Sequence, residues 1–200
     1  MFWQNVHQLD QHITLAINSW NSAFSDPIWA FLSMKLVWAP LYAGILALII
    51  WKLGWKKGGI LIVFTLLTFV FCDQFANLVK YSVARIRPLH DEFMVSHGLN
   101  ILEGGGGYSF FSAHAANSFG LAGCTWFGLK NYLKDSTDST DARIVRWYGW
   151  FMFTWASLVA VSRIFVGKHY LGDVIVGTIV GLAFGCSLGI ATSIINRRLA

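Results

Sequence analysis

Charged side chains are scarce in this chain of 200 residues. Asp, Glu, Lys and Arg together make up 12% of the sequence, whereas soluble domains average roughly 25%. This composition argues against a soluble domain, a disordered chain and a basic nucleic-acid-binding protein, and the net charge of +5 is modest. Hydrophobic residues reach 56% and the mean hydropathy is +0.54. The sequence therefore predicts a membrane protein.

Cysteine is also rare, and its placement argues against a disulfide scaffold. The chain has three cysteines, an odd number. Cys72, Cys124 and Cys186 all fall in apolar stretches. We therefore expect no disulfide framework.

The N-terminal segment, residues 1–22, lacks the features of a signal peptide. It has no basic start and no continuous apolar core. Instead Val6, Leu9, Ile13 and Ile17 recur every three or four residues, which is the period of an amphipathic helix. Such a helix can lie in the membrane interface or pack on the rest of the protein, and both can hold.

Long apolar runs fill most of the remaining sequence. A helix needs about 20 such residues to cross a hydrocarbon core of about 30 Å. The first run starts at Asp26-Pro27, which we interpret as an N-cap followed by proline in the first turn. We predict one all-α domain over residues 1–200, a polytopic transmembrane bundle of about five spans. These spans are 27–51, 58–79, 112–129, 147–165 and 171–195.

A stripe of glycines runs along the last predicted span. Gly177, Gly181, Gly185 and Gly189 occur one every four residues, so they share one helix face. Small residues in this pattern let another helix approach closely. We favour packing within the bundle over a dimer interface.

The cations predict the orientation of the bundle. Five spans place the polar loops 81–111 and 164–170 on one side of the membrane. The other side, with the loops 52–57 and 130–146 and the tail, carries nine of the 15 Lys and Arg residues. The positive-inside rule then places the C-terminus in the cytoplasm and the polar loops outside.

Three polar segments converge on the outer side of this predicted bundle. They are Lys80-x6-Arg87-Pro88, Phe111-Ser112-Ala113-His114 and Ser162-Arg163-x5-His169-x3-Asp173. Charges near a bilayer are costly, so a cluster of them indicates a functional site. Each segment alone is weak evidence, but a chance arrangement of all three at one membrane level is improbable.

The residue types in these segments point to phosphate chemistry. Lys80, Arg87 and Arg163 have no matching acidic cluster, and both Arg and Lys bind phosphate. Ser112 opens a helix, whose free N–H groups also favour an anion. His169 and Asp173 lie four residues apart, so the carboxylate can hold one imidazole nitrogen and leave the other free to attack phosphorus.

The three segments resemble the signature of the type 2 phosphatidic acid phosphatase (PAP2) superfamily, which is Lys-x6-Arg-Pro, Pro-Ser-Gly-His and Ser-Arg-x5-His-x3-Asp. The resemblance runs directly from Lys80 to Asp173, and the five-span layout extends it over most of the chain. The first and third segments match at every fixed position. In the second, Phe111 replaces proline and Ala113 replaces glycine, while Ser112 and His114 are retained.

The resemblance implies a role for each matching residue. His169 would be the nucleophile that forms a phosphohistidine, and Asp173 would orient it. His114 would protonate the leaving group and then activate water. The phosphate oxygens would be held by Lys80, Arg87, Ser112 and Arg163. No metal and no cofactor is expected. Asp73 and Asn77 share a helix face with Lys80, and we favour a supporting role for them over a polar face satisfied within the bundle.

The expected function is that of a lipid-phosphate phosphatase of a bacterial inner membrane, with its site facing outward. Its partners would be the bilayer and a lipid phosphate, with no nucleic acid. We favour undecaprenyl diphosphate as substrate, beside phosphatidylglycerophosphate, lipid A 1-phosphate and phosphatidic acid. The alternative is a catalytically inactive lipid-phosphate-binding membrane protein. A vanadate-dependent haloperoxidase has a similar pocket, but those proteins are soluble.

Overall fold

The computed structural model describes residues 2–199. Met1 and Ala200 lie outside the described residues, as do the side chains of Phe2 and of residues 196–199, so the predicted orientation signal of Arg197 and Arg198 is outside them too. The described chain is all-helical, as predicted. Its elements are α1 (Phe2–Asn18), α2 (Asp26–Ser33), η1 (Leu36–Trp38), α3 (Ala39–Val83), η2 (Pro88–His90), α4 (Glu92–Ser96), α5 (Ala113–Leu133), α6 (Ser139–Phe165) and α7 (Leu171–Leu199).

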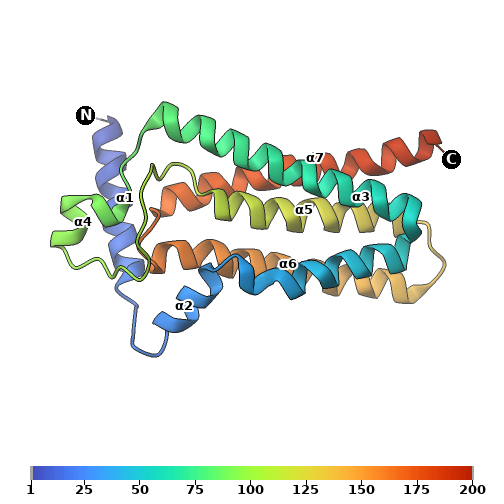
Figure 1. The fold of residues 1–200 in the computed structure, drawn as a ribbon, viewed down its shortest axis with the longest axis horizontal. Helices are drawn as coiled ribbons and strands as arrows, with labels where there is room; N and C mark the ends of the chain where they lie inside the picture. Colours follow the sequence, from blue (N-terminus) through green and yellow to red (C-terminus); the bar gives the residue numbers. More distant parts are fainter. Residues whose placement is uncertain (1, 200) are drawn as a thin grey trace.

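The helix α3 folds back on itself at Gly54. This residue has φ +69°, a conformation that side-chain-bearing residues rarely adopt. The two arms of α3 therefore run along the bundle in opposite directions (Figure 1). The sequence predicted a loop at 52–57, and the structure replaces it with this single bend. Beside the bend, Lys52 Nζ lies 2.7 Å from Asp141 Oδ1 at the start of α6.

The predicted first span, 27–51, is wrong as one continuous helix. A helix does begin here, with Pro27 in its first turn as predicted, but Asp26 is its first residue and the N-cap position is Ser25, so Asp26 is not the N-cap. This helix ends at Ser33, because Met34 has an extended backbone (ψ 135°). The long helix begins again only at Ala39, with Pro40 in its first turn. Proline fits a first turn but disrupts a helix interior, which explains why the two helices do not merge.

The glycine stripe of α7 packs against α5, as predicted. A Cβ atom built on Gly181 would lie 2.2 Å from the carbonyl oxygen of Ala116. Gly177 and Gly185 stand in the same way against the carbonyl oxygens of Ser112 and Gly120. The backbones of α5 and α7 can therefore touch only because these positions have no side chain. This contact fixes the beginning of α5 against the beginning of α7.

Three segments within the described residues are long and apolar enough to cross a membrane, namely Leu36–Ser96, Ser139–Phe165 and Leu171–Ile195. The coarse prediction of a helical membrane protein is confirmed, and the count of five crossings stays a prediction. The helix α6 starts at Ser139 rather than at 147. Asp138 caps it, with its Oδ1 accepting a hydrogen bond from Thr140 N at 2.8 Å. The cysteines are free thiols, as predicted.

The helix α1 closes one end of the bundle (Figure 1), and its polar side faces the protein. Asn18 Nδ2 donates to the carbonyl of Ile164 at 3.0 Å, and Thr14 Oγ1 accepts from Leu171 N at 3.0 Å. Val6 and Leu9, by contrast, are 43% and 60% exposed. The packed position that the sequence allowed is thus realised through these polar residues together with Ile17, which packs against the core, while Val6 and Leu9 stay outside.

Candidate active site

His169 sits in the tight turn that connects α6 to α7. Gly167 makes this turn possible, because it has φ +79° and a Cβ there would lie 2.9 Å from the carbonyl oxygen of Asn100. His169 is 3% exposed and Asp173 is fully buried. The Nδ1 atom of His169 lies 3.4 Å from Oδ2 of Asp173, outside hydrogen-bond geometry. Catalytic hydrogen bonds are often long before substrate binds.

Both oxygens of Asp173 are held from other directions. Oδ2 accepts from Tyr170 N at 3.0 Å, and Oδ1 accepts from Arg85 at 2.8 Å. Since Nδ1 of His169 faces this fixed carboxylate, Nε2 is the ring nitrogen available to a substrate. Burial lowers the pKa of His169 to about 4, and the nearby carboxylate only partly opposes this effect. The imidazole is therefore neutral, and so nucleophilic, at neutral pH.

The three predicted cations converge on this pair. Arg163, at the end of α6, is 2% exposed and donates to Ser33 Oγ. Its Nε atom is buried without a hydrogen-bond partner among the described residues. Arg163 and Arg87 lie close enough to His169 to interact electrostatically with its imidazole. Arg87 and Asp173 interact in the same way with Lys80. A buried guanidinium with a free N–H is suited to an oxyanion.

The second predicted segment completes the cluster. Ser112 is the N-cap of α5, with its Oγ accepting from Ala115 N at 3.4 Å. Its backbone N donates to the carbonyl of Asp173 at 3.0 Å. His114 follows in the first turn of α5, close enough to Arg163 and His169 to interact electrostatically with both. The structure thus brings together all seven residues singled out as catalytic or phosphate-binding.

The two departures from the family signature are accommodated. Ala113 is the first residue of α5, and among the described non-glycine residues only Ala84 has a positive φ. Glycine's conformational freedom is therefore not needed at position 113. Phe111 is buried and packs against Phe75, with ring centroids 5.8 Å apart.

The glycine run 104–107 lies beside the cations. Gly107 has φ +79°, and its carbonyl accepts from Arg87 Nε at 3.3 Å. Glu103, just before the run, lies 2.8 Å from Lys168 Nζ and 3.5 Å from Arg163. Burial alone would raise the pKa of Glu103, but hydrogen bonds and the charges of these two cations bring it below its usual value. The carboxylate stays ionised and balances part of the positive charge.

Asp73 and Asn77, which we expected to support Lys80, differ in their contacts. Asp73 Oδ1 accepts a hydrogen bond from Asn117 Nδ2 at 2.8 Å, and the carboxylate interacts electrostatically with Lys80. Asn77 is exposed, and no described contact connects it to Lys80. Sequence reasoning missed Glu103 and Arg85, which contact Arg163 and Asp173 directly, and Asp10, which contacts Arg85. The available signals were a carboxylate beside a glycine run and an extra arginine next to Arg87.

An apolar cavity of about 520 Å³ adjoins the cluster. His114, Lys35 and Asp73 line it together with apolar side chains of both arms of α3, of α5 and of α6. Leu121 also lines it, about two helical turns beyond His114. The cavity therefore extends from the site into the bundle. Its volume lies within the roughly 300–1,000 Å³ of typical ligand pockets.

The site lacks the residue groups that hold metals. Within the described part of the chain, no three His, Cys, Asp or Glu side chains are placed so that they could hold a metal ion. The acidic side chains near His169 are instead engaged by arginine and lysine.

Two proteins with assigned activities align with most of the chain. A lipid A 4'-phosphatase of Bacteroides thetaiotaomicron is 34% identical over 88% of this chain and 73% of its own length. A lipid A 4'-phosphatase of Porphyromonas gingivalis is 26% identical, over 90% of this chain and 71% of its own.

Solved structures share the architecture. A PAP2-type phosphatidylglycerolphosphate phosphatase of Bacillus subtilis superposes with a TM-score of 0.70 and 18% identity, covering 98% of this chain and 88% of that one. The LpxE protein of Aquifex aeolicus gives a TM-score of 0.59 and 20% identity, over 88% and 92% of the two chains. The family model of the PAP2 superfamily matches residues 58–197. The chain therefore belongs to the PAP2 superfamily of lipid phosphatases and is a membrane protein.

Proposed function

We propose that this protein is a metal-independent phosphatase that removes phosphate from a membrane lipid through a phosphohistidine on His169. The observation that carries the proposal is the convergence of the His169–Asp173 pair with Lys80, Arg87 and Arg163 beside the apolar cavity. The pair supplies a nucleophile, the cations supply a phosphate site, and the cavity supplies room for a lipid. No single part would specify a lipid phosphatase.

In the first step, Nε2 of His169 attacks phosphorus and the bond from phosphorus to the lipid oxygen breaks. His114 donates the proton that the leaving oxygen needs. The cations and Ser112 stabilise the charge that develops on the other phosphate oxygens. Asp173 stabilises the positive charge that forms on the imidazole ring, as the carboxylate of a hydrolase triad does.

In the second step, His114 accepts a proton from water, whose oxygen attacks the phosphohistidine. The bond between phosphorus and Nε2 breaks, inorganic phosphate leaves and neutral His169 is restored. The placement of His114 supports this assignment, because it lines the cavity while His169 lies in the buried turn. The leaving oxygen then points toward the space that holds the lipid.

The relatives favour a phosphorylated glycolipid as the substrate. Both aligned phosphatases carry the name lipid A 4'-phosphatase, so we propose a phosphate monoester of lipid A or of a related glycolipid. Undecaprenyl diphosphate, which the sequence analysis favoured, gains no support from them. The phosphatidylglycerolphosphate phosphatase, at 18% identity, shows the shared fold alone.

We propose five membrane crossings, made by the two arms of α3 and by α5, α6 and α7. The N-terminus lies at the end of the bundle that holds the site, and the C-terminus lies at the opposite end (Figure 1). With the cation bias, this supports a bacterial inner-membrane protein with a cytoplasmic C-terminus and an outward-facing site. The exposed Val6 and Leu9 support a position of α1 in the lipid interface.

Phosphate release by the purified protein in detergent tests the function. We expect release from lipid A with EDTA present, and less release from undecaprenyl diphosphate, phosphatidylglycerophosphate and phosphatidic acid. EDTA should leave the rate unchanged, because residues of the chain supply the positive charge that a metal supplies elsewhere. Loss of activity in EDTA that Mg²⁺ restores would overturn the metal-free mechanism. Binding of lipid A without any release would instead support the inactive binding protein.

Ser112→Ala tests the phosphate site. We expect a loss of about 10²–10³-fold in kcat if the hydroxyl donates to a phosphate oxygen. The change also removes the helix cap, which costs about 0.5–2 kcal/mol of stability. Asp138→Ala is the matched control, since it removes the cap of α6 without touching the site. A wild-type rate for Ser112→Ala would remove this serine from the phosphate site.

A further inference from the structure

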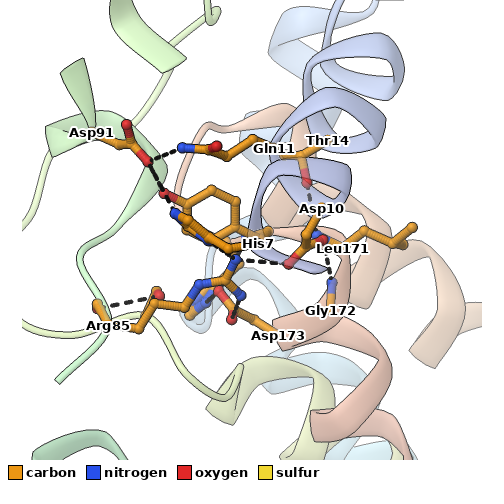
Figure 2. A network of polar contacts seen from close by, with 12 residues as sticks. His7, Asp10, Gln11, Thr14, Arg85, Asp91, Leu171, Gly172 and Asp173 are labelled. Atoms are coloured by element: carbon orange, nitrogen blue, oxygen red, sulfur yellow. Dashed lines mark hydrogen bonds and ion pairs between the residues drawn. The ribbon is translucent and has the colours of Figure 1, made fainter. Parts of the chain in front are cut away.

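Arg85 bridges two carboxylates that come from opposite ends of the sequence. One terminal nitrogen lies 2.8 Å from Asp173 Oδ1, and the other lies 2.8 Å from Asp10 Oδ2 on α1. His7 Nδ1 lies 3.0 Å from the second nitrogen. Figure 2 shows this guanidinium between the N-terminal helix and the start of α7. Both of its terminal nitrogens are therefore engaged by residues of the chain.

Asp10 also contacts the backbone at the start of α7, next to Asp173. Its Oδ1 accepts a hydrogen bond from Gly172 N at 2.9 Å (Figure 2). A Cβ on Gly172 would lie 2.8 Å from Asp10 Oδ2, so a side chain at this position would displace the carboxylate. One carboxylate of α1 thus fixes both the arginine that holds Asp173 and the backbone from which Asp173 projects.

Tyr170 holds the guanidinium from its flat side. The centre of the Arg85 guanidinium lies 3.8 Å from the centroid of the Tyr170 ring, a cation–π arrangement. The hydroxyl of Tyr170 donates to Asp91 Oδ2 at 2.6 Å, and Gln11 of α1 donates to the same oxygen at 2.7 Å. Arg85 therefore has little freedom to move. The helix α1 restricts it directly through Asp10 and indirectly through Gln11.

We propose that Asp10 and Arg85 are positioning residues, which hold Asp173 and through it the His169 ring in the orientation that attack on phosphorus requires. This inference rests on the proposed function for its catalytic meaning, and on the contacts above for its geometry. It makes the N-terminal helix part of the catalytic apparatus. A planar arginine fork suits the task, since it fixes two carboxylates at once.

The two residues carry opposite charges, so their removal should move the pKa of His169 in opposite directions. Loss of Arg85 removes a positive charge beside Asp173, which makes the imidazolium less unfavourable and raises the pKa. Loss of Asp10 removes a negative charge and lowers it. The groups that face Arg85 are His7, Asp10, Tyr170 and Asp173. The charges that act on the His169 imidazole are those of Asp173, Arg163 and Arg87, and the His114 ring lies near it.

Kinetics on lipid A give the first readout. We expect Arg85→Gln to lower kcat by about 10²-fold, because misplacing a reacting group by 1 Å can cost that much. Asp10→Asn, one contact further away, should lower kcat by about 10-fold. KM should change little in both, since neither residue contacts the phosphate. Arg85→Lys keeps the charge without the fork, so it should retain the pKa of His169 and lose most of the rate.

Asp141→Asn is the matched control. It breaks the ion pair with Lys52, which lies about 33 Å from Arg163 along α6. We expect a comparable loss of stability with wild-type kcat and an unchanged pKa of His169. If the loss of any ion pair lowered activity, Asp141→Asn would lower kcat as much as Arg85→Gln and Asp10→Asn do.

NMR titration of ¹⁵N-histidine-labelled protein, with His169 assigned from a His169→Gln variant, gives a readout that needs no turnover. We expect an upward pKa shift of about one unit for Arg85→Gln and a smaller downward shift for Asp10→Asn. An identical His169 pKa in wild type and both variants would overturn the proposal, whatever the activity. If the shifts occur but the wild type hydrolyses no lipid phosphate, the proposed function is wrong and the positioning contacts stand.

Discussion

Replacing His169 with alanine is expected to abolish phosphate release. The residue is the buried imidazole of the turn between α6 and α7, with Nδ1 facing Asp173 and Nε2 free for phosphorus. Without it no phosphoenzyme can form, and the remaining groups can only bind the phosphate and polarise it. Removing the central group of a catalytic unit costs on the order of 10⁶-fold in kcat in a serine protease. We expect at least about 10⁴-fold here, measured as phosphate release from lipid A.

The matched control is His97→Ala, which removes an exposed histidine at the end of α4. This variant should keep the wild-type rate. Rapid quenching at alkaline pH, where phosphohistidine survives, should trap phosphate on the wild type and on the control but not on His169→Ala. Substantial turnover by His169→Ala would remove this residue as the nucleophile. A wild type that turns over without a trapped intermediate would favour direct attack by water.

The parts of the site that depend on short spacings could be predicted from sequence. His169 and Asp173 lie four residues apart across a helix start, so any helix that begins near Leu171 brings them together. Ser112 reads as a helix cap from its own chemistry and proved to be one. The glycine stripe has a period of four residues, which placed it on one helix face before any partner was known. Local rules determine each of these features.

The parts that depend on how distant segments meet could not be predicted. Arg85 looked like one more cation of an outer loop, because its partner Asp10 is 75 residues away on a separate helix. The break after Ser33 was hidden in an apolar run, since hydropathy alone does not distinguish a helix from an extended residue between two helices. The loop expected at 52–57 is a bend at Gly54 instead, because a group of lysines does not show whether a helix ends. The lysines there remain within the helix, and only the glycine changes direction.

The contact between α5 and α7 leads to the second large effect, which we expect from Gly181→Ala. The added Cβ would lie 2.2 Å from the carbonyl oxygen of Ala116 and 2.8 Å from its Cα. These are backbone atoms, so no side-chain rotation relieves the clash and the two helices must separate by about 1 Å. Overpacking of this kind costs about 1–3 kcal/mol of stability. We expect a lower midpoint of thermal unfolding in detergent.

The separation should also reach the chemistry, because α5 carries Ser112 and His114 while α7 carries Asp173. A shift of about 1 Å between these groups can lower kcat by roughly 10²-fold. Gly44→Ala is the matched control. Nothing lies within 4 Å of a Cβ at Gly44 in the first arm of α3, and alanine is the better helix former by about 1 kcal/mol. Gly44→Ala should therefore unfold no earlier than wild type and keep its rate. If Gly181→Ala matched it in both measurements, the glycine stripe would not be the contact that holds the two halves of the site together.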